Sequence, residues 1–157
     1  MYNSKLRTPT QLMNWMRDIE YTEFTQLKSP EEVFLTKSGS CHDQVMFEIA
    51  ELKNIGVKPI AKFLMAVDKD NIGGETHSFV YWVLPRSAYW VENAWSDFRG
   101  LHMYKTEDEL VVDVIEKFRE RNPNQYIYLS DFDPAAHTIG EDLDTFVDIC
   151  MGNAELV

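Results

Sequence analysis

The side chains best suited to covalent chemistry in this sequence are one cysteine, one histidine and one glutamate. Cys41 lies in the stretch 38–43, and His77 and Glu92 follow in two later segments, 76–82 and 89–95. A cysteine nucleophile needs a base to hold its proton, and the base needs a third group to fix its tautomer. We therefore predict that Cys41 is a nucleophile, that His77 is its base and that Glu92 orients the base.

The residues around Cys41 predict the start of a helix. Ser40 is a favourable N-cap, and Asp43 three residues later gives a capping-box pattern. This places Cys41 in the first helical turn, where free backbone N–H groups and the helix dipole favour a thiolate. Gly56 is expected to end the helix. The alternative is that Cys41 is only a small buried apolar side chain, as free cysteines often are.

The spacing between His77 and Glu92 fits a β-hairpin. Leu84-Pro85, the strand breaker of this segment, lies midway between them. A turn centred there puts His77 directly opposite Glu92, with Cβ atoms roughly 4.5–5.5 Å apart. A longer turn would move Glu92 away from His77 and bring Asp97 nearer, so Asp97 is the rival orienting acid.

The elements that must position these residues follow from periodicity and turn signals. We expect helices over 9–19, 30–38, 41–55, 106–121 and 141–151, and strands over 58–67, 77–83, 89–95 and 125–129. Loops are expected over 68–75, 97–105 and 131–140. This order predicts an α+β fold, with an antiparallel sheet packed against helices. Residues 1–157 are expected to form a single domain.

Composition and charge restrict the classes of partner. The net charge of −11 argues against nucleic acid or an anionic membrane as the main partner and permits basic substrates. No apolar stretch has transmembrane length, and residues 1–7 lack the apolar run of a signal peptide. Two cysteines do not make a disulfide framework. A cytoplasmic location is the simplest expectation.

The two blocks together resemble the transglutaminase-like superfamily of cysteine enzymes, which have papain-like folds. The first block is 38–45 at the helix start, and the second contains His77, Trp90, Glu92 and Trp95. The resemblance spans roughly residues 29–95, and the family usually has Asp where this chain has Glu92. It implies a papain-like core with the nucleophile at a helix N-terminus. It also implies acyl transfer from an amide or ester, of peptidase, deamidase or transglutaminase type, on a peptide or protein substrate without metal or organic cofactor.

Other polar residues receive simpler interpretations. The oxyanion donors would be the Cys41 backbone N–H and one side chain, for which Tyr21 and Gln26 are the candidates. A metal site built on Cys41, His42, Asp43 and His77 is not favoured, because adjacent helical residues do not converge and paired Cys or His spacing is missing. Loop positions in solvent are expected for His102 and His137, a solvated helix face for Glu141, Asp142, Asp144 and Asp148, and a core position for Cys150.

The alternative function is a catalytically silent module that binds a protein partner. The segments around His77 and Glu92 are rich in aromatic residues, which are frequent at interfaces. In this interpretation they form an exposed recognition surface made of Tyr81, Trp82, Tyr89, Trp90 and Trp95.

Overall fold

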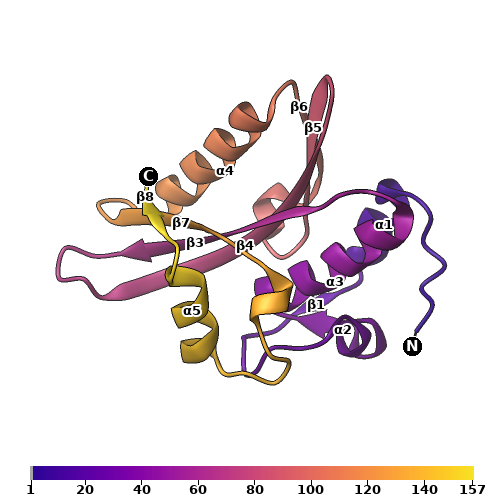
Figure 1. Ribbon diagram of the computed structural model, residues 1–157, viewed down its shortest axis with the longest axis horizontal. Coiled ribbons are helices and arrows are strands. Elements are labelled where there is room, and N and C mark those ends of the chain that lie inside the picture. The colour runs from indigo at the N-terminus through magenta and orange to yellow at the C-terminus, as the bar shows by residue number, and fades with distance from the viewer. Residues whose placement is uncertain (1) are drawn as a thin grey trace.

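The computed structural model describes residues 2–157 and has an α+β architecture, as expected (Figure 1). The helices are α1 (Pro9–Met16), α2 (Pro30–Thr36), α3 (Cys41–Ile55), α4 (Glu107–Arg121) and α5 (Leu143–Met151). The main sheet is antiparallel, with the order β6-β5-β4-β3-β7-β8. Its strands are β3 (Ile60–Val67), β4 (Gly73–Leu84), β5 (Ser87–Glu92), β6 (Gly100–Tyr104), β7 (Tyr126–Asp131) and β8 (Glu155–Leu156).

Shorter elements complete the chain. The two-residue strands β1 (Glu20–Tyr21) and β2 (Ser38–Gly39) pair in parallel just before α3. Two 3₁₀ turns, η1 (Ser96–Phe98) and η2 (Pro134–Ala136), follow β5 and β7. Within residues 2–157, no helix combines the length and apolar character needed to cross a bilayer.

The expected helix ends are present in the structure. Ser29 and Ser40 each form a capping box, with Glu32 and Asp43 respectively, at the starts of α2 and α3. α3 ends at Gly56, whose φ of 94° lies in the left-handed region that glycine adopts without strain. Local side-chain chemistry therefore fixes where the helix that carries Cys41 begins and ends.

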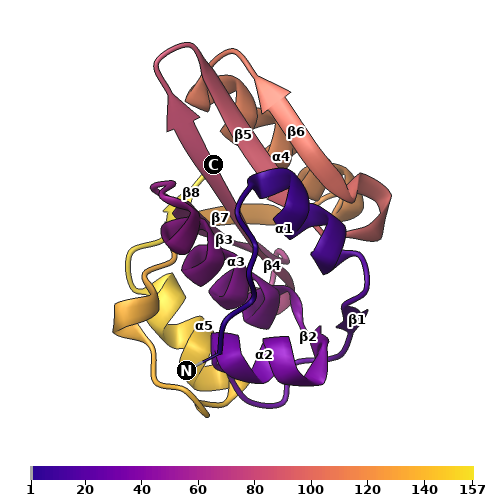
Figure 2. The ribbon, with the colours of Figure 1, turned by 90° about the vertical axis from the view of Figure 1, so that its right-hand side faces the viewer.

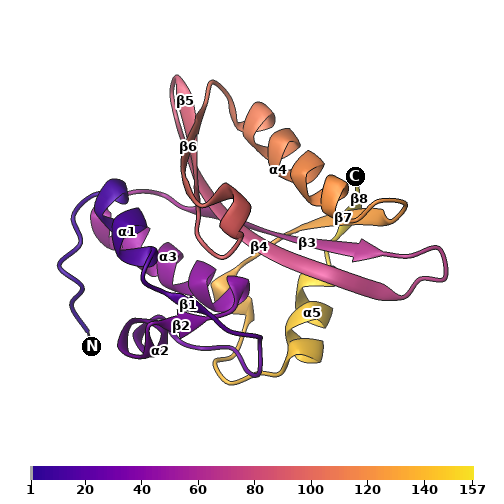
Figure 3. The ribbon, with the colours of Figure 1, turned by 180° about the vertical axis from the view of Figure 1, so that it is seen from behind.

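The sheet separates two apolar cores. On one face, α1, α2, α3 and α5 pack around buried residues such as Phe47 and Phe146. On the other face α4 packs alone, around residues such as Trp90 and Phe118. Figures 2 and 3 show α4 on one side of the sheet and the other four helices on the opposite side.

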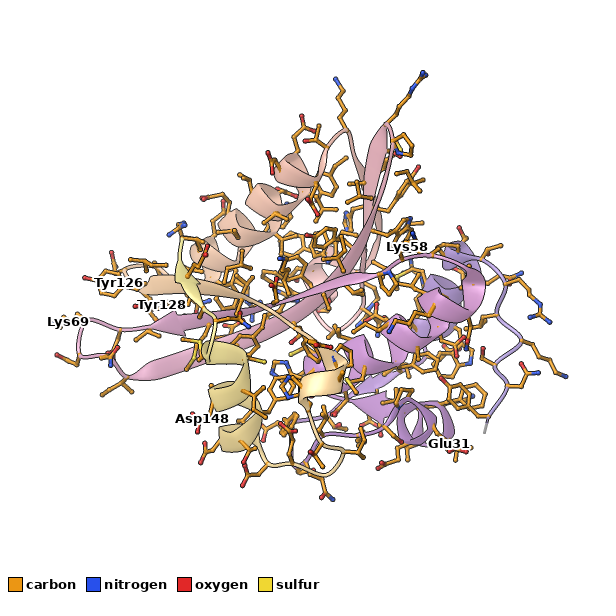
Figure 4. The ribbon with its side chains drawn as sticks, in the orientation of Figure 1. Glu31, Lys58, Lys69, Tyr126, Tyr128 and Asp148 are labelled. Carbon is orange, nitrogen blue, oxygen red and sulfur yellow. The ribbon has the colours of Figure 1, made fainter. Side chains whose placement is uncertain are left out.

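The pairing between β4 and β5 is shorter than β4 itself. Residues Val80–Leu84 pair with Ser87–Val91, while the earlier part of β4 pairs only with β3, with a register shift between Gly73 and Thr76. In Figures 1 and 3 the β3–β4 hairpin therefore extends well past β5 and β6. Lys69 marks the tip of this hairpin in Figure 4.

The predicted register of the hairpin is wrong by two residues. The turn consists of Pro85 and Arg86, because Leu84 pairs with Ser87, so His77 is not directly opposite Glu92. Side chains alternate with a period of two, so a two-residue shift keeps Glu92 on the same face as His77. The two residues become diagonal neighbours, still within reach of long side chains.

Three further predictions about strands need correction. His77 lies inside β4 and does not open it, and β6 and β8 occupy segments where no strand was predicted. In β6 the outward residues Leu101 and Met103 are apolar and 38% and 71% exposed, so the usual pattern of apolar residues facing the core is missing. These elements depend on pairing with a neighbouring strand, which outweighs local propensity.

Candidate active site

Cys41 is the first residue of α3, and its surroundings hold it in place. Ser40 Oγ accepts a hydrogen bond from the Asp43 backbone N–H at 3.3 Å, and the Asp43 carboxylate accepts one from the Ser40 N–H at 2.9 Å. A Cβ at Gly39 would lie 2.8 Å from Asp43 Cβ, so glycine is needed for this close approach. The Cys41 thiol therefore sits at the N-terminus of a well-capped helix, 6% exposed.

His77 and Glu92 form a buried hydrogen-bonded pair. His77 Nε2 lies 2.7 Å from Glu92 Oε1, and both side chains are less than a tenth exposed. The second oxygen of Glu92 accepts a hydrogen bond from the Trp95 backbone N–H at 2.9 Å. Because Nε2 is engaged by Glu92, Nδ1 is the ring nitrogen left for Cys41. Asp97, the rival acid, is exposed in η1.

The thiol and the imidazole shift each other's pKa. Burial alone would raise the pKa of Cys41, but the neighbouring His42 and His77 rings outweigh it and lower the pKa to about 5. Burial alone would lower the pKa of His77, but the Glu92 carboxylate and contact with Cys41 raise it to about 10. Between these values the favoured state is a thiolate beside an imidazolium.

His42 is a contributor that the sequence interpretation missed. Its ring is buried, with Nδ1 2.6 Å from Ser78 Oγ and Nε2 3.1 Å from Thr76 Oγ1. Among the neighbours of Cys41, His42 does most to lower the pKa of the thiol. The sequence held one sign of this role of His42. Thr76 and Ser78 flank His77 and, by strand alternation, face the opposite way from it, where they can bond to another ring.

A second missed residue is Glu48, seven positions after Cys41 on the same face of α3. Its side chain is 3% exposed, and its Oε2 has no hydrogen-bond partner. Burial and the nearby charge of Glu92 raise its pKa well above the usual range for a carboxyl group. Its raised pKa means that Glu48 favours the protonated form in the folded protein.

Two hollows meet at Cys41. One, of about 280 Å³, is lined by Tyr21, Cys41, Glu75, Thr76, His77, Ala94, Trp95, Ser96 and Arg121. The other, of about 300 Å³, is lined by Tyr21, Glu23, Phe24, Ser40, Cys41, His42, Glu75, Thr76 and Leu143. Of the two proposed oxyanion side chains, Tyr21 lines both hollows, whereas Gln26 is exposed and lines neither.

Arg121 borders one of these hollows. Its guanidinium makes an ion pair with Glu75 at 2.9 Å and lies 5.3 Å from the centre of the Trp95 ring. It thereby links the C-terminal end of α4 to the β4 residues that border Cys41.

Several residues lie elsewhere than expected. His102 is in β6 and stacks on Trp90, with its Nε2 2.6 Å from the Phe98 carbonyl oxygen. The His137 side chain is 1% exposed because it packs against Phe132 and Phe146 and bonds to Glu141. Both histidines were predicted to lie in solvent, and that prediction is wrong.

The expected acidic face of the last helix also needs one correction. The Glu141 side chain is 5% exposed, so it belongs to the buried contacts of His137, while the other three acids of that face are exposed. Cys150 lies in the core, as expected.

The aromatic residues do not form the exposed surface that the alternative function requires. Four of them are at most 6% exposed, namely Tyr81, Trp82, Trp90 and Trp95, and Tyr89 is half-buried. In the part of the chain that the structure describes, no group of three or more His, Cys, Asp or Glu side chains is arranged to hold a metal ion.

Compared with known protein families and with curated proteins, the sequence matches neither a family nor an individual protein.

Proposed function

We propose that this protein is a cysteine-dependent acyl-transfer enzyme that acts on an amide or ester through Cys41, His77 and Glu92. One observation carries the proposal. A thiol at a capped helix N-terminus lines the same hollow as a histidine whose Nε2 lies 2.7 Å from a buried carboxylate oxygen. A nucleophile, a base and an orienting group in this order are the components of thiol acyl-transfer catalysis.

In the first step the Cys41 thiolate attacks the acyl carbonyl carbon and forms the C–S bond. The negative charge that develops on oxygen is stabilised by the Cys41 backbone N–H, which has no acceptor inside the helix, and by the Tyr21 hydroxyl. The His77 imidazolium then gives its proton to the leaving nitrogen or oxygen, and the C–N or C–O bond breaks. A thioester on Cys41 and a neutral imidazole remain.

In the second step neutral His77 removes a proton from water or an amine, which attacks the thioester carbon. The C–S bond breaks, and the thiolate and imidazolium are restored. Glu92 stays ionised throughout and holds the ring in one tautomer. Water as acceptor gives hydrolysis, and an amine gives transamidation.

We also propose that the fold is a transglutaminase-like, papain-like core. Its support is the arrangement of a helix-start cysteine with a histidine and an acid on the neighbouring strands β4 and β5. A reducing, cytoplasmic setting suits both free cysteines. A peptide or protein is the proposed substrate.

The test is the pH dependence of alkylation of Cys41 by a small reagent such as iodoacetamide, followed by intact mass. Because the pKa of Cys41 is lowered to about 5, the rate should reach its plateau near neutral pH, whereas an ordinary thiol still gains reactivity above pH 8. His77→Ala should move the rise to higher pH. Cys41→Ser is the control and should not be alkylated. The remaining cysteine, Cys150, reacts poorly because burial raises its pKa to about 12.

A profile that rises only near pH 9 in both wild type and His77→Ala would contradict the proposal. It would instead favour the catalytically silent module. A panel of acyl-donor electrophiles, read by mass at Cys41, would then define the acyl preference of a reactive thiol.

A further inference from the structure

The two hollows that meet at Cys41 are bordered by different histidines. His77 and Arg121 line one hollow, whereas His42 and Leu143 line the other. In the proposed mechanism His77 gives its proton to the leaving nitrogen or oxygen, so the leaving group has to lie beside His77. The hollow that His77 lines is therefore the leaving-side hollow, and the acyl group of the substrate occupies the other.

The leaving-side hollow contains a permanently charged cation. Arg121 is the last residue of α4, which runs toward the β3–β4 hairpin in Figures 1 and 3. Among the described residues that line the two hollows, no other is a lysine or an arginine. A guanidinium keeps its proton at every pH at which proteins are folded. A fixed positive charge therefore borders the place of the leaving group.

Two contacts hold the Arg121 guanidinium and leave part of it free. Its Nε–H donates a hydrogen bond to Glu75 Oε1 at 2.9 Å, and its Cζ lies 5.3 Å from the centre of the Trp95 ring. Within residues 2–157, its two terminal nitrogens have no hydrogen-bond acceptor. The side chain is 43% exposed, so a ligand can reach it. Because the guanidinium is already oriented, it loses little freedom when it binds a ligand.

The free part of the guanidinium has the geometry that recognises a carboxylate. Its terminal nitrogens form a planar set of donors that matches the two oxygens of a carboxylate. The hollow measures about 280 Å³, which suits a small leaving group. The net charge of −11 repels a free anion, so the affinity for a carboxylate depends on this local contact.

We propose that Arg121 binds a carboxylate carried by the leaving amine of the substrate. The substrate class is then an amide of a small amino acid, such as the last peptide bond of a chain or an N-acyl amino acid. This inference rests on the proposed function, because it names the substrate of the same site. When the C–N bond breaks, the acyl group stays on Cys41 as a thioester. The amino acid leaves with the proton from His77 on its nitrogen.

The experiment measures how well small ligands protect Cys41 from alkylation by iodoacetamide, read by intact mass at matched ionic strength. N-acetylglycine carries the carboxylate on its leaving side, and N-acetylglycinamide has the same shape without the charge. The concentration that gives half protection should be about tenfold lower for N-acetylglycine. γ-Acetamidobutyrate places its carboxylate where a glutamate side chain would. The acid that protects better therefore distinguishes a chain terminus from an acidic side chain as the source of the carboxylate.

Substitutions of Arg121 test which residue produces the preference for the acid. Arg121→Gln should remove most of it, and Arg121→Lys should keep a part, because lysine supplies the charge without the paired donors. Arg119→Gln is the matched control and should keep the full preference. Arg119 lies on the same helix, pairs with Glu116 at 3.3 Å and lines neither hollow.

Three results overturn the inference: equal protection by the acid and the amide, no protection by either, or the same preference in Arg121→Gln as in wild type. If iodoacetamide then still shows the low-pH, His77-dependent reaction, only the substrate class fails. If that reaction is also missing, the proposed function fails with it.

Discussion

The carboxylate of Glu92 reaches His77 along a diagonal of the β4–β5 pair. Diagonal neighbours are roughly 7–8 Å apart, farther than residues directly opposite each other. The hydrogen bond of 2.7 Å therefore uses the full length of a glutamate side chain. This explains physically why a glutamate, and not an aspartate, occupies this position. An acid on a strand with this register needs the additional methylene.

Replacing Glu92 tests this arrangement. Glu92→Gln should keep the fold and lower the rate of acyl transfer by about two to four orders of magnitude, because the imidazolium loses its orienting charge. Glu92→Asp should also lose activity, since the shorter side chain does not span the diagonal. Asp97→Asn is the matched control and should leave the rate unchanged. Full activity in Glu92→Gln together with loss in Asp97→Asn would make Asp97 the orienting acid.

Glu48 should make folding stability depend on pH. Its pKa is raised in the folded state, so above about pH 4.5 the unfolded chain releases a proton that the folded chain keeps. Stability should therefore fall as pH rises, by about 1.4 kcal/mol per pH unit up to the folded pKa. Glu48→Gln removes this dependence.

The measurement is urea unfolding of both proteins at pH 4 and pH 7. The variant should gain stability relative to wild type between the two values. An equal difference at both values would mean that Glu48 is ionised in the folded protein.

At the scale of elements, the start of α3 was predictable from sequence and the strand pairing was not. Ser40 and Asp43 are three residues apart, so their hydrogen bonds follow from local sequence. The position of Glu92 relative to His77 depends instead on where the hairpin turns, and Pro85 marked that turn only to within about a residue. β6 was not predictable because Leu101 and Met103 face outward. His42 and Glu48 were missed because their roles come from burial against other elements.

The cap of α3 should control the thiol as well as the helix. Ser40→Ala should cost about 0.5–2 kcal/mol of stability. It should also raise the pKa of Cys41, because a frayed first turn loosens the thiol from His42 and His77. Thr106→Ala is the control, since Thr106 caps α4 in the same way, accepting from the Glu109 N–H at 3.2 Å. It should lose similar stability and leave the alkylation profile unchanged. Equal profiles in both variants would show that the cap is only structural.

At the scale of the whole molecule, the candidate site draws on both faces of the sheet: Thr76 and Ser78 bond to His42 of α3, whereas His77, which faces the other way, packs against Trp95 of the core beneath α4. Phe146, on the side of α3, contacts the His42 ring with centroids 4.5 Å apart. Leu110 belongs to the core beneath α4. The α+β class followed from the order of elements, but the assignment of helices to the two faces required the structure.

Truncation in the two cores should therefore separate stability from reactivity. Phe146→Ala and Leu110→Ala each remove a side chain that is fully buried and should cost about 2–5 kcal/mol. Only Phe146→Ala should raise the pKa of Cys41, because it removes one of the aromatic rings packed against His42. Thermal unfolding and the alkylation profile measure the two effects. The same shift in thiol pKa for both variants would mean that general loosening of the fold is the cause.

The ion pair between Arg121 and Glu75 should make one end of the site sensitive to ionic strength. Both side chains are more than a third exposed, so added salt screens their attraction, whereas the buried His77–Glu92 pair is protected from mobile ions. Arg121 borders one hollow beside Cys41 through Glu75 and Trp95. Salt should therefore loosen that end of the site while leaving the reactive centre intact. The protein would then accept bulkier ligands in concentrated salt than in dilute buffer, with the same intrinsic thiol chemistry in both.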